Sequence, residues 1–252
     1  MIQIRNLQKT FGEKAVLRSV DLDIYDSEKL VIIGRSGCGK SVLLKHIINL
    51  LQPEKGYILV DDIAIRRVGQ KDLFFLRKQF GFLFQGAALF DSMSVAENVA
   101  LPLHEHTSLS EKEIERKVAE KLELVGLPGT ENLRPAELSG GMKKRIGLAR
   151  AIIMDPKYVL YDEPTTGLDP IMAANIDKLI IELSDKLKIT SIVVTHDMQS
   201  VAKVADRVVM LHNGRIIFSG SVDELYETDN EVVHQFIHGK AEGPIQPKPQ
   251  LY

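Results

Sequence analysis

The sequence contains little cysteine, no long apolar run and almost no net charge. Cys38 is the one cysteine of 252 residues, which excludes an intramolecular disulfide and any cysteine-rich zinc site. The longest stretch without Asp, Glu, Lys or Arg is the twelve residues 79–90, whereas a helix that spans a bilayer needs about 20. The chain is therefore not expected to form a membrane pore. Because no apolar signal core follows Met1, the expected location is the cytosol.

The near balance of charge bears on the expected partners. Lys and Arg number 32 against 34 Asp and Glu, which leaves a net charge of −2. Proteins that bind a nucleic-acid backbone usually carry a basic surplus. The composition therefore predicts no nucleic-acid partner. The length predicts one or two domains with a sizeable core.

Short apolar runs alternate with helical patterns along the chain. These runs are residues 30–33, 159–161 and 192–194. Unbroken apolar runs of this length are typical of strands buried on both faces, and their alternation with helices predicts a parallel α/β sheet. Residues 20–24 instead alternate apolar and charged side chains, which predicts a strand with one solvated face, and Ile2 and Ile4 indicate a partner strand.

Two helix starts carry recognisable capping residues. Ser110 is followed by Glu113, which completes a capping box, and Asp169 is followed by Pro170 at the first helical position. The segment 86–150 reads as mostly helical without a clear buried strand. We therefore expect a helical insertion in the connectivity of the sheet.

Residues 34–41 fit the pattern G-x-x-x-x-G-K-[ST] and lie between a buried strand and a helical run over 42–51. The glycines allow successive N–H groups to surround a phosphate, Lys40 reaches the β- and γ-phosphates, and Ser41 is a ligand for Mg²⁺. The predicted ATP-binding residues here are Gly34, Arg35, Ser36, Gly37, Cys38, Gly39, Lys40, Ser41 and Val42. Cys38 is interpreted as a small space-filling residue rather than a redox switch.

Asp162 and Glu163 close the second buried strand, at the end where open α/β sheets bind ligands. Neighbouring residues on a strand point to opposite sides, so the two carboxylates can have different tasks. Asp162 is predicted to hold Mg²⁺, and Glu163 to orient the water that attacks the γ-phosphate. Such a pair alone is more often a solvated strand end. The phosphate-binding loop favours the functional interpretation.

The run Leu138-Ser139-Gly140-Gly141-Met142 completes an ordered set of motifs. With it, residues 1–238 resemble the nucleotide-binding subunit of ATP-binding-cassette (ABC) transporters. The resemblance implies a P-loop NTPase fold of the α/β class, with a RecA-like parallel core sheet, an N-terminal antiparallel β subdomain and a helical signature subdomain at about 86–150. Residues 239–252 would be an extended C-terminal extension.

The resemblance also implies roles for single residues. Phe11 would stack on adenine, Gln85 would be the Q-loop glutamine near Mg²⁺, Asp169 would belong to the D-loop, and His196 would be the switch histidine. The predicted catalytic residues are thus Glu163, His196 and Gln85, and the predicted Mg²⁺ residues are Ser41, Gln85 and Asp162. Taken alone, Phe11 could be a core residue, Gln85 a surface glutamine and His196 a helix cap.

Ser139 and two glycines that open a helix form a second anion-binding helix terminus. One nucleotide cannot easily use both termini within a monomer. The family resolves this with two subunits arranged head to tail, so the resemblance implies a dimer with a second copy of the chain. The positive run 143–145 on the same helix is interpreted as a solvated face.

Met142 stands where most ABC ATPases have glutamine, and this methionine is typical of the ATPases of Mla- and Mce-type lipid-transport systems. Residues 84–107 resemble the segment of that branch which lines the groove for the coupling helix of the permease. Residues 236–245 resemble its C-terminal extension, which reaches the partner ATPase. The alternative for this tail is disorder.

The resemblance therefore implies an ATPase that uses ATP and Mg²⁺ to power phospholipid transport between membranes through a separate integral-membrane permease. It would lie on the cytoplasmic side of the inner membrane, attached through that permease. Further partners implied are a small regulatory subunit and an MCE-type lipid-binding protein.

Three other functions fit parts of the sequence. An ABC importer or exporter of amino acids, metals or drugs shares every ATPase motif. A soluble ABC ATPase is disfavoured because the chain has one phosphate-binding loop and no sustained heptads. A non-enzymatic module is disfavoured because the expected site residues are all present.

Overall fold

Two β-sheets and the helices packed on them form the described part of the chain, which in this computed structural model is residues 1–246, apart from the side chain of Gln70. The strands are β1 Ile2–Phe11, β2 Lys14–Ile24, β3 Lys29–Ile33, β4 Lys55–Val60, β5 Ile63–Ala64, β6 Phe80–Leu83, β7 Tyr158–Asp162, β8 Thr190–Val194, β9 Arg207–His212 and β10 Arg215–Gly220. The helices are α1 Lys40–Ile47, α2 Gln70–Arg77, α3 Val95–His106, α4 Glu111–Leu124, the 3₁₀ turn Pro135–Glu137, α5 Gly140–Ile152, α6 Pro170–Leu187, α7 Met198–Val204, α8 Val222–Glu227 and α9 Glu231–Ile237.

The larger sheet has the strand order β10-β9-β3-β8-β7-β6. Every neighbouring pair is parallel except β9 and β10, which are antiparallel. The three apolar runs of the sequence are β3, β7 and β8 in the interior of this sheet, so the predicted parallel α/β core is confirmed.

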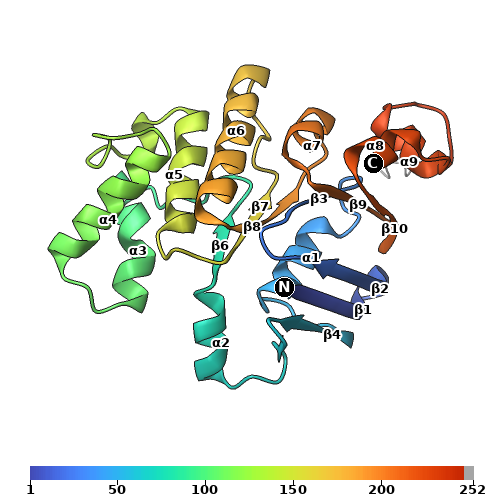
Figure 1. Ribbon diagram of the computed structural model, residues 1–252, viewed down its shortest axis with the longest axis horizontal. Helices are drawn as coiled ribbons and strands as arrows, with labels where there is room; N and C mark the ends of the chain where they lie inside the picture. The colour runs from blue at the N-terminus through green and yellow to red at the C-terminus, as the bar shows by residue number, and fades with distance from the viewer. Residues whose placement is uncertain (247–252) are drawn as a thin grey trace.

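Alternation along the strands sends side chains to two separate cores. Leu30 and Ile32 of β3 pack with α1 and with the smaller sheet, whereas Val31 and Ile33 pack with α5, α6 and α7. Figure 1 shows α1 between the two sheets, with α6 and α7 on the opposite face of the larger sheet. Burial on both faces explains why these strands have no polar alternation.

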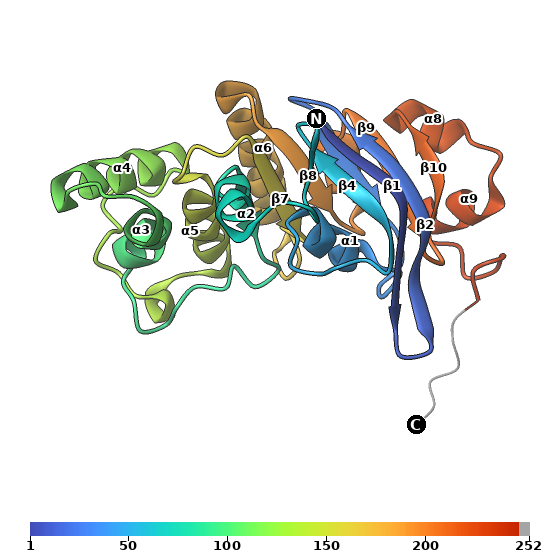
Figure 2. The same ribbon diagram turned by 90° about the horizontal axis from the view of Figure 1, so that it is seen from below.

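The smaller sheet has the order β2-β1-β4-β5 and is antiparallel. Ile2 pairs with Ile24 and Ile4 with Leu22, as the alternating pattern predicted. The hairpin of β1 and β2 extends beyond the rest of the sheet in Figure 2. Phe11 and Lys14 face each other near its turn.

The helices α3, α4 and α5 form a group at one side of the molecule (Figure 1). The capping box of Ser110 and Glu113 begins α4, and Asp169 caps α6 with Pro170 at its first position. The helix after the phosphate-binding loop differs from the expected 42–51, since α1 begins at Lys40 and ends at Ile47. Asn49 has a φ of 55°, a left-handed conformation that a continuing helix does not accept.

Close backbone approach positions α5 against the larger sheet. A Cβ on Gly81 of β6 would lie 2.2 Å from the carbonyl oxygen of Ala151. Any larger residue at this position would separate the strand from the helix. Glycine therefore sets the distance between α5 and the edge of the sheet that carries Gln85.

The chain ends, as far as it is described, in a segment that bends back over α9. The side chain of Gln235 accepts a hydrogen bond from the backbone N–H of Ile245 and donates to the carbonyls of Lys240 and Ile245. The part of the expected extension over 239–246 is thus folded against α9 rather than extended, because Gln235 satisfies its backbone groups. Residues 247–252 of that extension lie outside the described residues.

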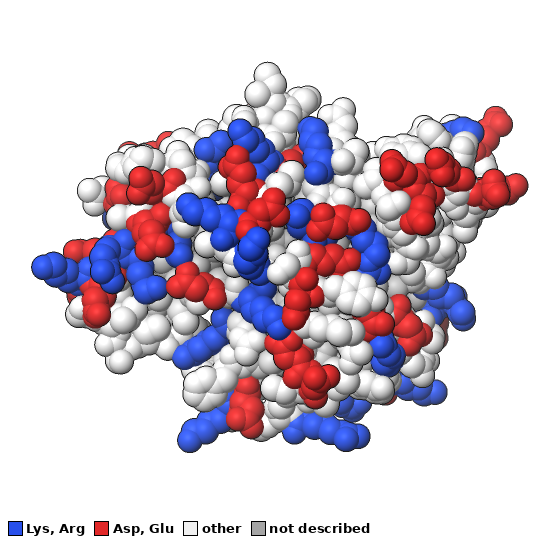
Figure 3. All heavy atoms as spheres, in the orientation of Figure 1, with Lys and Arg blue, Asp and Glu red and all other residues white. Residues whose placement is uncertain are grey.

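Lys and Arg are interspersed with Asp and Glu over the face shown in Figure 3, which agrees with the small net charge. Within residues 1–246, no helix has both the length and the apolar character that crossing a bilayer demands.

Candidate functional site

Strand order brings four loops to one edge of the larger sheet. The phosphate-binding loop, residues 34–41, follows β3, and His196 follows the neighbouring β8. Asp162 and Glu163 lie at the end of β7, and Gln85 follows β6. Because these strands are parallel neighbours, their carboxyl ends meet, and such an edge is where open α/β sheets bind ligands.

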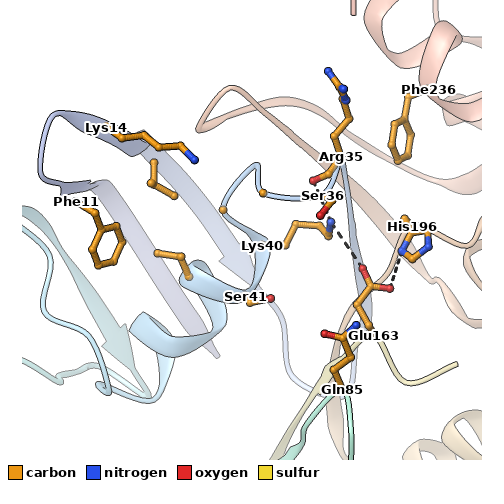
Figure 4. Close-up of a pocket in the computed structure, with 14 residues that line it drawn as sticks. Phe11, Lys14, Arg35, Ser36, Lys40, Ser41, Gln85, Glu163, His196 and Phe236 are labelled. Atoms are coloured by element: carbon orange, nitrogen blue, oxygen red, sulfur yellow. Dashed lines mark hydrogen bonds and ion pairs between the residues drawn. The ribbon is translucent and has the colours of Figure 1, made fainter. Parts of the chain in front are cut away.

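A cavity of about 640 Å³ opens at this edge (Figure 4). The predicted site residues that line it are Phe11, Arg35, Ser36, Gly37, Gly39, Lys40, Ser41, Val42, Gln85, Glu163 and His196. Gly34 and Cys38 belong to the phosphate-binding loop but do not line the cavity. Asp162 does not line it either, but accepts a hydrogen bond from Ser41, which does. The cavity volume suits a small-molecule ligand of ordinary size.

The phosphate-binding loop is shaped by glycines in the left-handed region. Gly37 has a φ of 74° and Gly39 a φ of 111°, which residues with a Cβ rarely adopt. Lys40 is 7% exposed, and its ammonium donates to the carbonyls of Gly34 at 2.7 Å and Arg35 at 3.2 Å. Among the described residues 1–246, no side chain caps the first turn of α1, so its N–H groups can take an anion.

Glu163 has a φ of 51°, a conformation that costs a residue with a side chain about 1–2 kcal/mol. Its backbone N–H donates to the carbonyl of Val194 at 2.9 Å. One carboxylate oxygen lies 2.8 Å from Nδ1 of His196, and the other lies 3.8 Å from the Lys40 ammonium. The strained backbone thus directs the carboxylate into the cavity between a cation and a histidine (Figure 4).

Ser41 and Asp162 offer oxygen ligands side by side. The Ser41 hydroxyl donates to a carboxylate oxygen of Asp162 at 2.9 Å. Hydroxyl and carboxylate oxygens suit Mg²⁺, which commonly takes one or two protein ligands and completes its shell with phosphate and water. Within residues 1–246, no cluster of three or more His, Cys, Asp or Glu forms an all-protein metal site. The donor set therefore fits Mg²⁺ bound together with a nucleotide.

The signature segment, residues 138–142, and Asp169 do not line the cavity. Ser139 caps α5 by accepting from the N–H of Met142, and Ser139 and Gly140 are exposed. A Cβ on Gly141 would lie 2.2 Å from the methyl end of Met172, so this glycine allows close packing against α6. Asp169 caps α6 by accepting from two N–H groups.

Phe11 is 46% exposed at the far wall of the cavity, and the Lys9 ammonium lies 5.2 Å from its ring centroid. Sequence reasoning missed three further residues that line the cavity: Lys14, Val16 and Phe236. Strand alternation could have indicated the first two, because residues two apart on β2 share a face. Phe236 comes from α9 with no local signal that places it there.

The interpretation of the run 143–145 as a solvated face is wrong for Lys144, because its side chain is only 5% exposed. Gly141, Lys144 and Leu148 are all buried and lie three and four residues apart, so Lys144 faces the protein interior. The ammonium donates to the carbonyls of Gln85 and Glu163, the latter at 3.2 Å.

Burial raises the pKa of the Cys38 thiol, against the lowering effect of the nearby Lys40 charge. A raised pKa disfavours the reactive thiolate. The space-filling interpretation is therefore the better supported one.

The chain has recognisable relatives among known proteins. The family model described as ABC transporter matches residues 17–166. The probable ribonucleotide transport ATP-binding protein mkl of Mycobacterium leprae is 44% identical over 244 residues, 97% of this chain and 70% of that protein. The intermembrane phospholipid transport system ATP-binding protein MlaF of Haemophilus influenzae is 41% identical over 246 residues, 98% and 93% of the two chains.

A solved dimeric ATP-binding cassette in a post-hydrolysis state with ADP and Pi is similar in structure. It superposes with a TM-score of 0.80 at 31% identity over 88% of this chain and 99% of that chain. The solved cassette therefore has the same overall fold as this chain.

Proposed function

The chain belongs to the ABC transporter family of ATP-binding proteins and is an ATPase, and on this premise we propose that it powers phospholipid transport through a separate membrane permease. The observation that carries the ATPase chemistry is the cavity that joins the phosphate-binding loop to Glu163 and His196. The lipid substrate is supported by similarity to MlaF over nearly the full length of both chains.

ATP would place its phosphates in the loop 34–41 and its adenine on Phe11. Lys40 supports this assignment, because within residues 1–246 the partners of its buried ammonium are two carbonyls and Glu163, and it can turn to a phosphate. The half-exposed Phe11 ring offers a flat apolar surface at the opposite wall. Aromatic rings commonly bind flat π-systems in this way.

Hydrolysis would depend on positioning and on charge stabilisation, as in other phosphoryl transfers. Glu163 would accept a hydrogen bond from the attacking water and orient it toward the γ-phosphate. His196 would hold the Glu163 carboxylate at 2.8 Å and approach the same phosphate. Gln85 would connect the site with the surface after β6.

Mg²⁺ would be held by Ser41 and Asp162, with Gln85 nearby, and would neutralise charge on the phosphate oxygens. The adjacent hydroxyl and carboxylate oxygens support this donor set.

The active form would be a head-to-tail dimer in which Ser139 and the following glycines of one copy close over the γ-phosphate in the other. Two observations support it: the exposed Ser139 and Gly140 contribute nothing to the cavity of their own chain, and Ile171 is 75% exposed beside the D-loop residue Asp169.

The permease would dock beside residues 84–107. A second cavity of about 370 Å³ supports this, with aromatic walls from Phe74, Phe80 and Phe82 and further contacts from Pro102 and His106. Attachment through this groove would hold the protein at the cytoplasmic side of the inner membrane. A small regulatory subunit and an MCE-type lipid-binding protein would complete the assembly.

A ribonucleotide is the alternative substrate, because the mycobacterial relative at 44% identity is named for ribonucleotide transport. That protein is longer, and this chain spans 70% of it against 93% of MlaF. The shared ATPase site does not separate the two, since transported substrate contacts the permease.

The test is purification of the tagged chain with its permease from membranes of the source cells, followed by mass spectrometry of proteins and lipids. We expect an Mla-type permease and bound phospholipid. ATP hydrolysis in the reconstituted complex should be stimulated by phospholipid and not by ribonucleotides other than ATP. Recovery of an amino-acid or nucleotide permease in their place would overturn the lipid assignment and leave the ATPase assignment standing.

A further inference from the structure

Helix α5 places a buried ammonium directly behind the ATP cavity. Lys144 is 5% exposed and donates hydrogen bonds to two main-chain carbonyls, one on Gln85 and one on Glu163 at 3.2 Å. These two residues come from different loops, after β6 and β7, and the side chains of both line the cavity. One charged group therefore fixes the backbone of both.

The pairing of this lysine is unusual for a buried cation. Within residues 1–246, no carboxylate oxygen lies within 4.0 Å of the Lys144 ammonium, so it forms no ion pair there. A buried charge without an ionic partner is costly unless hydrogen bonds satisfy it. Burial accordingly lowers the pKa of Lys144, while the negative charges of Glu163 and Asp162 act to raise it.

A second buried lysine of the same helical group shows the ordinary arrangement. Lys121 of α4 is 3% exposed, and its ammonium lies 2.6 Å from a carboxylate oxygen of Asp155. Neither Lys121 nor its hydrogen-bond partners Glu120 and Asp155 line the cavity. A buried lysine in this group of helices can thus be satisfied by a carboxylate, and the carbonyl partners of Lys144 are not a general consequence of burial.

We propose that Lys144 is a positioning residue for ATP hydrolysis, which sets the directions of the Gln85 and Glu163 side chains by holding their carbonyls. The inference rests on the roles proposed above for these two residues. Glu163 needs such support, because its φ of 51° is a conformation that the surrounding contacts must maintain. Its N–H donates to the carbonyl of Val194, and its carbonyl accepts from the Lys144 ammonium at 3.2 Å and from the N–H of Thr166 at 3.3 Å, so both sides of the strained residue are anchored.

The loop that carries Gln85 is likewise held from α5. Arg150 donates to the carbonyls of Ala87 and Ala88, two and three residues after the Gln85 carbonyl that Lys144 binds. The helix that begins at the signature segment therefore anchors the Gln85 loop at two points and the Glu163 backbone at one. A shift of this helix would move both cavity residues together.

The experiment compares Lys144→Met with Lys121→Met as the matched buried-lysine control. Steady-state ATP hydrolysis, equilibrium binding of ATP and thermal unfolding are measured for each. Because misplacement of reacting groups by about 1 Å can cost about 100-fold in rate, we expect Lys144→Met to lower kcat by about 10- to 100-fold. KM and Kd for ATP should remain within about threefold, since Lys40 and the loop 34–41 are untouched.

Lys144→Arg, which keeps donors for both carbonyls, should recover most of the lost kcat. Lys121→Met should leave kcat within about twofold at a comparable loss of melting temperature. A kcat for Lys144→Met within twofold of the wild type would overturn the inference, and so would equal losses of kcat in the two methionine variants.

Failure of the proposed function is separately visible. If Glu163→Gln does not reduce the ATP hydrolysis of the chain, the proposed site is wrong. If Glu163→Gln does reduce hydrolysis while Lys144→Met hydrolyses ATP like the wild type, only the role of Lys144 is wrong. Should Lys144→Met not fold, Lys144→Gln, whose neutral and shorter side chain is polar, carries the same expectation and the same refutation.

Discussion

Replacing the Glu163 carboxylate by an amide tests the centre of the proposed mechanism. Glu163→Gln keeps the size of the side chain and removes the charge between Lys40 and His196. We expect ATP to bind as tightly as before or more tightly, while turnover falls by about 100- to 10,000-fold, the range typical for loss of a general base.

The binding part of this expectation follows from the ion pair. At 3.8 Å and an effective dielectric constant of about 20, Lys40 and Glu163 attract each other by about 4 kcal/mol, most of which desolvation offsets. In the variant, Lys40 retains its two carbonyl partners. ATP binding then no longer requires the Lys40 ammonium to break its ion pair with the Glu163 carboxylate before it contacts a phosphate. The loss in turnover corresponds to about 3–5 kcal/mol of transition-state stabilisation.

Phosphate release and nucleotide binding are measured on the same preparation. Glu28→Gln is the control, because Glu28 is 8% exposed and paired with Arg207 at 2.6 Å, away from the cavity. It should lower the melting temperature and leave kcat within about threefold. Turnover of Glu163→Gln within tenfold of the wild type, or a clear loss of ATP affinity, would refute the reasoning.

Three further expectations concern the signature, the core and acid stability. Ser139→Ala should abolish hydrolysis and, as a lost helix cap, lower the free energy of unfolding by about 1 kcal/mol. Nucleotide binding by the isolated subunit should be unchanged. Lost binding would contradict the head-to-tail arrangement. Gly81→Ala should lower the free energy of unfolding by about 1–3 kcal/mol in chemical unfolding, because its Cβ would lie 2.2 Å from the Ala151 carbonyl oxygen. Gly69→Ala is the control, since a Cβ there meets no described atom within 4 Å. Equal losses in the two variants would argue against this packing. Burial acts to raise the pKa of Asp61, but hydrogen bonds led by that from Lys157 lower it to about 2, below the ordinary aspartate value of 3.8. The stabilisation from Asp61 is therefore present above about pH 4 and is lost as the pH falls toward 2, so the difference in stability between wild type and Asp61→Asn should shrink over that range; a constant difference would contradict the assignment.

Motifs made of neighbouring residues were readable from the sequence. The glycines and Lys40 of the phosphate-binding loop, the capping residues of α4 and α6 and the apolar runs of β3, β7 and β8 depend on local backbone geometry and on periodicity. The positions of Asp162, Glu163 and His196 at strand ends followed from the same runs. Their meeting at one edge could be expected once the sheet was read as parallel.

The misreadings concern side chains whose surroundings come from distant parts of the chain. Lys144 looks like a surface charge because its neighbours 143 and 145 are also basic, yet its helical position turns it toward the loops after β6 and β7. Phe236 reaches the cavity from α9, and Gln235 folds the C-terminal segment back.

Sequence alone therefore determined the fold class and the phosphate-binding chemistry of this ABC ATPase, because both are encoded in short stretches whose backbone conformation is nearly independent of the rest. Only the tertiary structure decided that Glu163 holds a left-handed conformation between Lys40 and His196, and that a buried lysine supports it. Such contacts join residues as far as 123 positions apart, as in Lys40 and Glu163, and depend on strand order and helix packing, which no local pattern specifies.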